Sequence, residues 1–237
     1  MAAADQNGIV DLLWGQLGKQ PAPARPSLSL PAIVAAATAI ADAEGIDGVS
    51  MQRVAGDLGF TKMSLYRYVS SKADLVAVMV ESAVGAPPDL SRVEGGWRER
   101  LLEFSRLLAA VWQRHPWLPW ATLGERVMGP REVGWVEAAV GALDGTGLSG
   151  GERMDAVFLL FGHLRNTESL TTSGTQPWTS DRRPSDAFAR ILDRHGATFP
   201  ALAAAIGDLG DAPHDNGRAF GLACILDGLT ARIDAKP

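Results

Sequence analysis

The sequence predicts an all-α protein, and two observations support this. Apolar residues recur at helical spacing in most segments, and no run alternates apolar with polar residues for more than a few positions. Ser residues precede these segments and Gly or Pro follows them, as at the ends of helices. With 237 residues, 46% of them hydrophobic, the chain can bury a core and form one large or two ordinary domains.

The composition also excludes several classes of protein. The single cysteine, Cys224, excludes a disulfide framework and a cysteine-clustered metal site. The N-terminus lacks a positively charged stretch before an apolar run, so it does not read as a signal peptide. No apolar run approaches the length of a membrane span. We therefore expect a cytoplasmic protein without a membrane partner.

Residues 1–26 are predicted to be a flexible N-terminal tail and Pro-rich linker. Gly15 and Gly18 interrupt the first apolar cluster, and four prolines fall within residues 20–31. Proline fixes φ and removes an N–H donor, so no helix is expected there. An arm for the minor groove of DNA is the alternative, although only Lys19 and Arg25 supply positive charge.

Residues 27–85 are predicted to form a compact unit of four short helices. Pro31 falls just inside the first helix, where its missing N–H costs nothing, and Gly45 ends that helix. The fourth helix is expected over residues 72–84. The candidate start residues of the four helices are Ser29, Ser50, Lys62 or Ser64, and Lys72.

Residues 96–237 are predicted to form a second, all-helical domain. The apolar segment Val157–Phe161 is expected to be buried on all sides. Residues 171–184, rich in Thr, Ser, Gly and Pro, are predicted to form a long loop. The expected helices cover residues 97–114, 130–143, 152–170, 185–195 and 214–234.

Residues 51–70 carry the pattern of a helix-turn-helix. Two helices that cross within twenty residues need a small residue at their contact, which Ala55 provides. The turn needs a residue that adopts a left-handed conformation, and Gly59 follows four positions later. The apolar contact between the helices is expected from Val54, Leu58, Phe60 and Leu65. This pattern is typical of DNA-binding helix-turn-helix units, and an ordinary helical hairpin is the alternative.

Charge and tyrosine content favour DNA binding by this segment. Residues 52–72 contain four basic residues against Asp57 alone, although the block 27–85 as a whole has six acidic residues and the chain has a net charge of −5. The only two tyrosines of the chain, Tyr66 and Tyr68, also lie here. Tyrosine hydroxyls and lysine ammonium groups donate to phosphate oxygens. A solvated polar face is the alternative.

The segment Leu65-Tyr66-Arg67-Tyr68-Val69, followed by Lys72 and Leu75, resembles the DNA-binding signature of tetracycline-repressor (TetR) type transcriptional regulators. Residues 33–45 are similar to the first helix of that family, and the resemblance covers about residues 30–80. It implies a helix-turn-helix DNA-binding domain over 27–85. It implies, more loosely, a helical ligand-binding and dimerisation domain over 96–237.

The resemblance also implies roles for single residues. The N-terminal residues of the recognition helix meet base edges, and Met63 would make an apolar contact there, to a thymine methyl for example. Lys72, at the start of a helix, would bind phosphate. The residues expected to contact DNA are Ser50, Gln52, Arg53, Lys62, Met63, Ser64, Tyr66, Arg67, Tyr68 and Lys72.

A ligand site is expected in the second domain. Tryptophans gather around two helix-breaking prolines, Pro116 and Pro119, and aromatic surface beside irregular backbone is typical of binding cavities. The alternative is that these side chains are core or dimer-interface residues. The candidate ligand-binding residues are Phe104, Trp112, Trp117, Trp120, Phe161, His163 and Asn166.

The last predicted helix carries a stripe of small residues that includes Gly217, Gly221, Cys224 and Gly228. Glycine costs about 1 kcal/mol in a helix, so several on one stripe indicate the close approach of another backbone. Packing within the chain is one interpretation. The family resemblance favours a homodimer, in which the two recognition helices lie about 34–36 Å apart and read a pseudo-palindrome.

No catalytic residues, cofactor or metal site are predicted, because no nucleophile or phosphate-loop motif occurs and the four histidines are scattered. We therefore expect a DNA-binding transcriptional regulator, a repressor that binds its operator as a homodimer and is released by a small-molecule effector. The alternative is a helical small-molecule-binding protein or enzyme with a vestigial helix-turn-helix.

Overall fold

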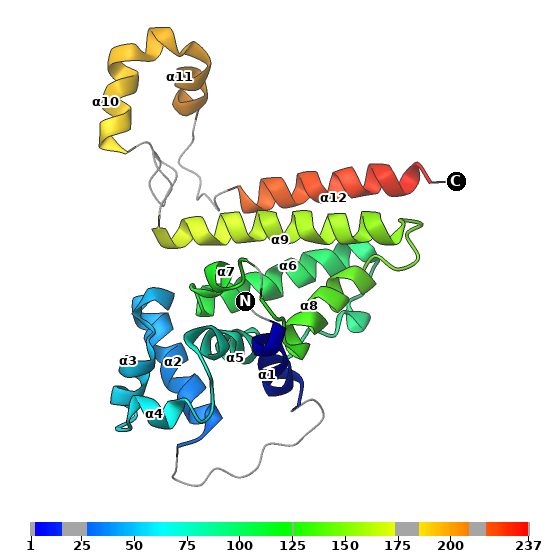
Figure 1. The fold of residues 1–237 in the computed structure, drawn as a ribbon. Helices are drawn as coiled ribbons and strands as arrows, with labels where there is room; N and C mark the ends of the chain where they lie inside the picture. Colours follow the sequence, from blue (N-terminus) through cyan, green and yellow to red (C-terminus); the bar gives the residue numbers. More distant parts are fainter. Residues whose placement is uncertain (1–2, 16–27, 125, 174–184, 209–216, 237) are drawn as a thin grey trace. The chain divides into compact units, whose positions relative to one another are not determined.

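The computed structural model describes residues 3–15, 28–124, 126–173, 185–208 and 217–236. Every regular element in these ranges is a helix, which confirms the all-α prediction (Figure 1). The chain divides into two compact units, Met1–Val157 and Phe158–Pro237. The predicted division at 27–85 and 96–237 stays a prediction, since the first unit holds all of residues 27–85 and also residues 96–157.

The helices of the first unit are α1 (Ala3–Trp14), α2 (Leu30–Glu44), α3 (Met51–Asp57), α4 (Lys62–Leu65), α5 (Lys72–Val84), α6 (Trp97–Arg114), α7 (Leu118–Ala121) and α8 (Pro130–Gly141), with 3-10 turns η1 (Ile46–Gly48) and η2 (Leu90–Arg92). Helix α9 (Gly150–Ser173) begins in this unit and ends in the second. The second unit also holds α10 (Asp186–His195), η3 (Gly196–Thr198), α11 (Pro200–Gly207) and α12 (Arg218–Asp234). The short helices α7 and α11 were not predicted. Of the predicted last helix, residues 214–216 lie outside the described residues.

Serine side chains start helices α2, α3 and α5, whereas α4 follows Thr61 without a side-chain cap. Ser29 Oγ accepts from the backbone N–H of Ala32 at 3.4 Å, and Ser71 Oγ accepts from that of Asp74 at 3.0 Å. Each bond satisfies an N–H that has no partner inside its own helix. Gly45, at φ 80°, ends α2 in a conformation that side chains disfavour. These helix ends are therefore set by local sequence.

Helix α5 is the central element of the first unit. Leu75 and Met79 of α5 are fully buried, and α5 packs against α1, α2, α7 and α8. Two of these neighbours, α7 and α8, come from the part of the chain after residue 96. The helix that follows the helix-turn-helix is therefore also a core helix of the remainder of the unit.

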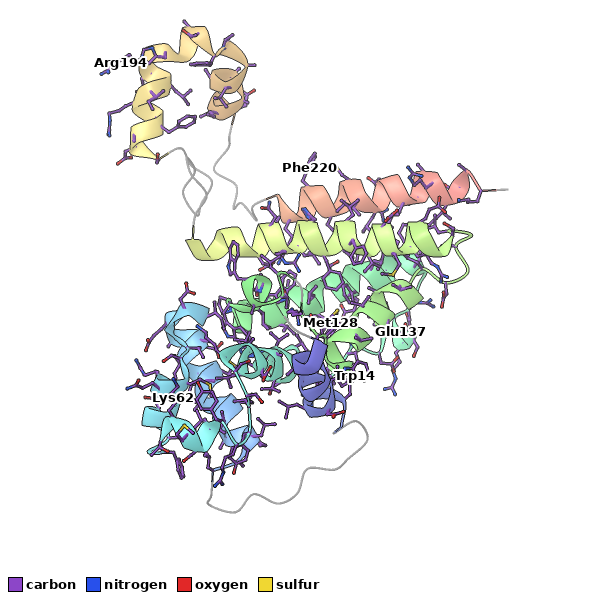
Figure 2. The ribbon with its side chains drawn as sticks, viewed as in Figure 1. Trp14, Lys62, Met128, Glu137, Arg194 and Phe220 are labelled. Atoms are coloured by element: carbon purple, nitrogen blue, oxygen red, sulfur yellow. The ribbon has the colours of Figure 1, made fainter. Side chains whose placement is uncertain are left out.

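The N-terminal segment differs from its prediction. Residues 1–26 were predicted to be a flexible tail, but Ala3–Trp14 forms α1, in which Ile9 and Leu13 are each 4% exposed. The indole Nε1 of Trp14 donates to the carbonyl oxygen of Met128 at 3.0 Å (Figure 2). Burial of these apolar side chains against α5 outweighs the weak helical pattern of the segment. The predicted linker over 16–26 lies outside the described residues.

The segment Val157–Phe161 also differs from its prediction. Val157 and Leu160 are each 1% exposed, whereas Phe158 is 61% and Leu159 is 57% exposed. The expectation that this segment is buried on all sides was therefore wrong for the single chain. Helix α9 meets its own chain along one side and leaves apolar side chains on the other.

Candidate nucleic-acid interface

Helix α3, the turn and α4 form a helix-turn-helix. Ser50 Oγ accepts from the backbone N–H of Arg53 at 3.1 Å and starts α3. Ala55, 2% exposed, sits at the contact, and its carbonyl accepts from the N–H of Phe60 at 2.9 Å. Gly59 makes the turn at φ 72°, as predicted. The side chain of Phe60, expected between the helices, is instead 45% exposed, because the turn directs it outward.

Helix α4 holds one side chain inward and presents the others. Leu65 is fully buried, whereas Met63 is 73% and Tyr66 is 37% exposed. Lys62 is exposed (Figure 2). Its ammonium nitrogen lies 5.5 Å from the centre of the Tyr66 ring. Ser64, half-buried, lies 2.9 Å through its hydroxyl from that of Thr61. The outer face of α4 thus combines a cation, a phenol and an apolar side chain.

Lys72 begins α5 beside this face. The cap is reciprocal, since Ser71 Oγ accepts from the N–H of Asp74 while Asp74 Oδ2 accepts from the N–H of Ser70 at 3.1 Å. Lys72 and Arg67 are both exposed. The three side chains on which the DNA-binding interpretation depends most (Lys62, Tyr66 and Lys72) are therefore all exposed on the segment 62–72.

Arg53 forms ion pairs with two carboxylates of its own chain. Its guanidinium lies 2.9 Å from Glu44 Oε1 and 3.2 Å from Asp57 Oδ1. These neighbours, Glu44 first, raise the pKa of Arg53 above its ordinary value. Arg53 would have to leave both partners to contact a phosphate or a base. Gln52, also expected at DNA, is exposed at the start of α3.

Tyr68 differs from its prediction as a donor to DNA. Its hydroxyl donates to the carbonyl oxygen of Leu28 at 2.5 Å, and the side chain is half-buried. A phenol has one proton to donate, so that of Tyr68 is occupied in this structure. Tyr68 ties the segment before α2 to the end of the helix-turn-helix.

The ligand residues predicted in the first unit do not share one environment. Phe104 is fully buried with its ring edge-on to Trp135, at 5.6 Å between ring centres. Trp112 is buried, whereas Trp120 is 51% exposed. Trp117 is buried, and its indole Nε1 donates to Asp42 Oδ1 at 2.7 Å. The predicted ligand role of these residues stays a prediction.

In the second unit, Phe161 is half-buried and Asn166 is exposed. His163 Nε2 lies 2.9 Å from the carbonyl oxygen of Arg218, and the guanidinium of Arg218 pairs with the buried carboxylate of Glu168. His163 and Glu168 of α9 therefore both join the first turn of α12.

A cavity of about 300 Å³ lies in the first unit, but none of the predicted ligand residues lines it. Small residues of α8 form one wall and Arg100 of α6 contributes to another. Its lining residues are Pro88, Asp89, Leu90, Ser91, Arg100, Ala138, Gly141 and Ala142.

The predicted dimer stripe divides between two environments. A Cβ added to Gly221 would lie 2.3 Å from Cε1 of His163, so this glycine admits α9 of the same chain. The contact favours packing within the chain at Gly221, and its assignment to a dimer contact stays a prediction. Gly217, at φ 74°, precedes α12 as its cap. Cys224 and Gly228 are exposed, and an added Cβ at Gly228 meets nothing within 4 Å.

Two carboxylates without a local sequence signal join distant elements of the first unit. Asp42 of α2 accepts from Trp117, 75 residues away. Glu81 of α5 accepts from the backbone N–H groups of Arg131 and Glu132 at 2.9 Å and 3.4 Å and so caps α8. No local pattern indicates such partners, because their separation along the chain exceeds any helical spacing.

Comparison with known proteins identifies the family. Residues 33–79 match the family described as bacterial regulatory proteins, tetR family, and residues 88–233 match the tetracyclin repressor-like C-terminal domain. The chain belongs to the TetR family. It is therefore a DNA-binding transcriptional regulator, and the helix-turn-helix is the DNA-binding unit of this TetR protein.

Individual relatives agree with this assignment. The chain is 33% identical over 236 residues to the HTH-type transcriptional repressor DrrR1 of Streptomyces coeruleorubidus, covering 94% of this chain and 85% of the relative. The structure of the Streptomyces coelicolor TetR family protein ActR in complex with actinorhodin has a TM-score of 0.71 at 24% identity, over 87% of this chain and 99% of that one. BioQ of Mycobacterium smegmatis, solved with its natural double-stranded DNA operator, has a TM-score of 0.58 at 20% identity, over 86% and 99%. These two structures show the shared fold.

Among the helices of the described residues, none combines the length and the apolar character that crossing a membrane requires.

Proposed function

We propose that this TetR protein is a repressor that binds a pseudo-palindromic operator as a homodimer and leaves it when a small molecule binds its C-terminal domain. The observation that carries the proposal is the exposed cluster of Lys62, Tyr66 and Lys72 on the segment 62–72. DrrR1 is named a repressor, which supports the direction of the response.

The DNA contacts are assigned from exposure and chemistry. Lys62, Met63 and Ser64 open the recognition helix α4, and residues at that position meet base edges in the major groove. Met63 suits a thymine methyl because its side chain is apolar and 73% exposed. Arg67 and Lys72, both exposed, then bind backbone phosphates. Tyr66 lies beside Lys62, whose ammonium nitrogen is 5.5 Å from the centre of the tyrosine ring.

The exposed apolar face of α9 and α12 supports a homodimer. Phe158 and Leu159 of α9 and Phe220 of α12 are 61%, 57% and 77% exposed. Cys224 and Gly228 lie on the same side of α12 as Phe220, at intervals of four residues, and are also exposed. A two-fold axis through this face would pair α9 and α12 with their copies and bury these side chains.

The effector part of the proposal is supported by the ActR complex with actinorhodin, which shows that a protein of this fold holds a small organic molecule. Helix α5 would transmit the effect of a bound effector to the DNA-binding segment, because it begins at Lys72 and packs against α7 and α8. An effector must bind the DNA-incompetent conformation more tightly, because equal affinity for both would shift nothing. Displacement of α5 would change the separation of the two recognition helices.

The experiment that tests the proposal selects duplexes from a randomised DNA library with the full-length protein. We expect a pseudo-palindrome with half-sites about 34–36 Å apart and, by light scattering, two chains on each selected duplex. Footprinting at the promoter next to the protein's own gene then locates the natural site. Selected sequences without two-fold symmetry, or a monomer at micromolar concentration, would contradict the proposal.

A further inference from the structure

One carboxylate oxygen joins the DNA-binding segment to the remainder of the first unit. Asp42, two residues before the last residue of α2, places Oδ1 2.7 Å from the indole Nε1 of Trp117 and 2.8 Å from Nδ1 of His115. His115 directly follows α6, and Trp117 directly precedes α7. The rings of His115 and Trp117 are 6.1 Å apart. Both partners thus lie at the break between α6 and α7.

The chemistry of the break explains why it needs this acceptor. Trp117 is 2% exposed, and a buried indole N–H without a partner costs free energy. Pro116 interrupts the helix here, so the backbone around it follows no regular ladder. Asp42 fills the need from α2, and α2 packs directly on α3 and α5. The bond therefore links the α6–α7 break to the helices that carry the recognition helix.

We infer that Asp42, His115 and Trp117 form a bridge that fixes the angle of the DNA-binding segment 28–85 on the rest of the unit, and that this angle sets the affinity for a two-half-site operator. None of the three lies on the segment 62–72, so they act as positioning residues. The inference rests on the dimeric operator binding proposed above. It reassigns Trp117 from contact with an effector to control of the DNA-binding segment.

If the bridge sets the angle of the DNA-binding segment, its loss affects duplexes with two half-sites and duplexes with one half-site differently, whereas a general loss of folding would affect both. A duplex with two half-sites is bound only when both recognition helices are at the right separation, which depends on the angle of each segment. A duplex with one half-site needs one recognition helix and no particular separation. Loosening the bridge therefore weakens binding to the full operator and leaves binding to the half-site unchanged.

The test compares Asp42→Ala, Asp42→Asn and Trp117→Phe with the wild-type protein. Both DNAs are derived from the duplex selected with the wild-type protein, one intact and one with a single half-site scrambled. We expect Asp42→Ala and Trp117→Phe to weaken binding of the intact duplex by about tenfold, within the usual range of coupling between sites, and to leave the half-site affinity unchanged. Asp42→Asn should recover most of the loss relative to Asp42→Ala, because its amide oxygen still accepts from the indole.

The control is Asp47→Ala, which removes an exposed acidic residue from the same segment without touching the bridge. It separates the effect of the lost charge from that of the lost hydrogen bond, and thermal unfolding checks that each variant is folded. Equal losses on both duplexes, or no loss on either, would overturn the inference. Failure of the wild-type protein to bind any two-half-site duplex would instead count against the proposed function.

Discussion

Lys72 is one of the residues proposed to bind DNA phosphate without reading the base sequence. Its exposed ammonium lies at the first turn of α5, where the helix N-terminus also favours a phosphate. We expect Lys72→Ala to weaken binding to all duplexes alike and to reduce the slope of log K against log salt by about 0.9, the share of one phosphate contact. Titrations at several salt concentrations measure the slope.

A matched control is Arg92→Ala, because the side chain of Arg92 is 89% exposed and lies outside the segment 62–72. It removes the same charge and should leave the slope as in the wild-type protein. A slope for Lys72→Ala equal to that of Arg92→Ala would reject the phosphate contact.

At the scale of an element, the start of α8 depends on a carboxylate from α5. Burial raises the pKa of Glu81 above its ordinary 4.5, and the backbone N–H groups of Arg131 and Glu132 oppose that shift only in part. Because the pKa is higher in the folded state, folding takes up a proton in the pH range between 4.5 and that raised pKa. As the pH falls through that interval, the folded state therefore gains stability.

Glu81→Gln tests this element. The amide cannot titrate, so the free energy of unfolding of the wild-type protein should rise relative to that of Glu81→Gln as the pH falls from 7 towards 4.5. Urea unfolding of both proteins at several pH values gives the difference. A difference that stays constant with pH would show that Glu81 titrates as an exposed carboxyl does.

Helix α1 makes a second prediction at this scale. Ile9 is 4% exposed, whereas its neighbour Val10 is 39% exposed. We expect Ile9→Ala to destabilise the protein by about 2–4 kcal/mol through the cavity it leaves. Val10→Ala on the same helix should change stability by only about 0.5 kcal/mol. Denaturant unfolding distinguishes them, and equal small effects would mean that α1 contributes no packing.

For the whole molecule, two glycines of α12 separate packing within the chain from association between chains. Gly221→Ala would press on the ring of His163, so we expect a loss of about 1–3 kcal/mol in stability, partly offset by the better helix propensity of alanine. Gly228→Ala meets nothing in its own chain and should leave the stability of the monomer equal or higher. If α12 meets its copy, Gly228→Ala should weaken the dimer.

Sedimentation equilibrium over a range of protein concentrations measures that dimer constant, and unfolding of dilute protein measures the monomer. Dimerisation of Gly228→Ala equal to that of the wild-type protein would place the two-fold contact elsewhere. Phe220→Ala on the same face, which is 77% exposed, provides a second variant with the same expectation.

Much of the DNA-binding unit could be predicted from sequence because its signals are local. Ser29, Ser50 and Ser71 cap their helices within three residues of themselves, and Gly59 turns the chain without help from elsewhere. The exposure of Met63 follows from the inward position of Leu65, because side chains two positions apart on a helix lie on opposite sides. The ligand residues lacked such support, because whether aromatic side chains meet around one space depends on how separate helices pack.

The sequence by itself determined the helical class, the helix ends between residues 28 and 85, and the motif that marks a TetR regulator. Only the tertiary structure decided that α1 packs on α5, that Tyr68 bonds to Leu28, that Asp42 holds Trp117, and that Gly221 faces its own chain. Caps and turns are fixed by interactions within about one helical turn, so the residues responsible lie close together in the sequence and can be recognised there. A buried donor takes whichever acceptor packing brings to it, and that partner can lie anywhere in the chain.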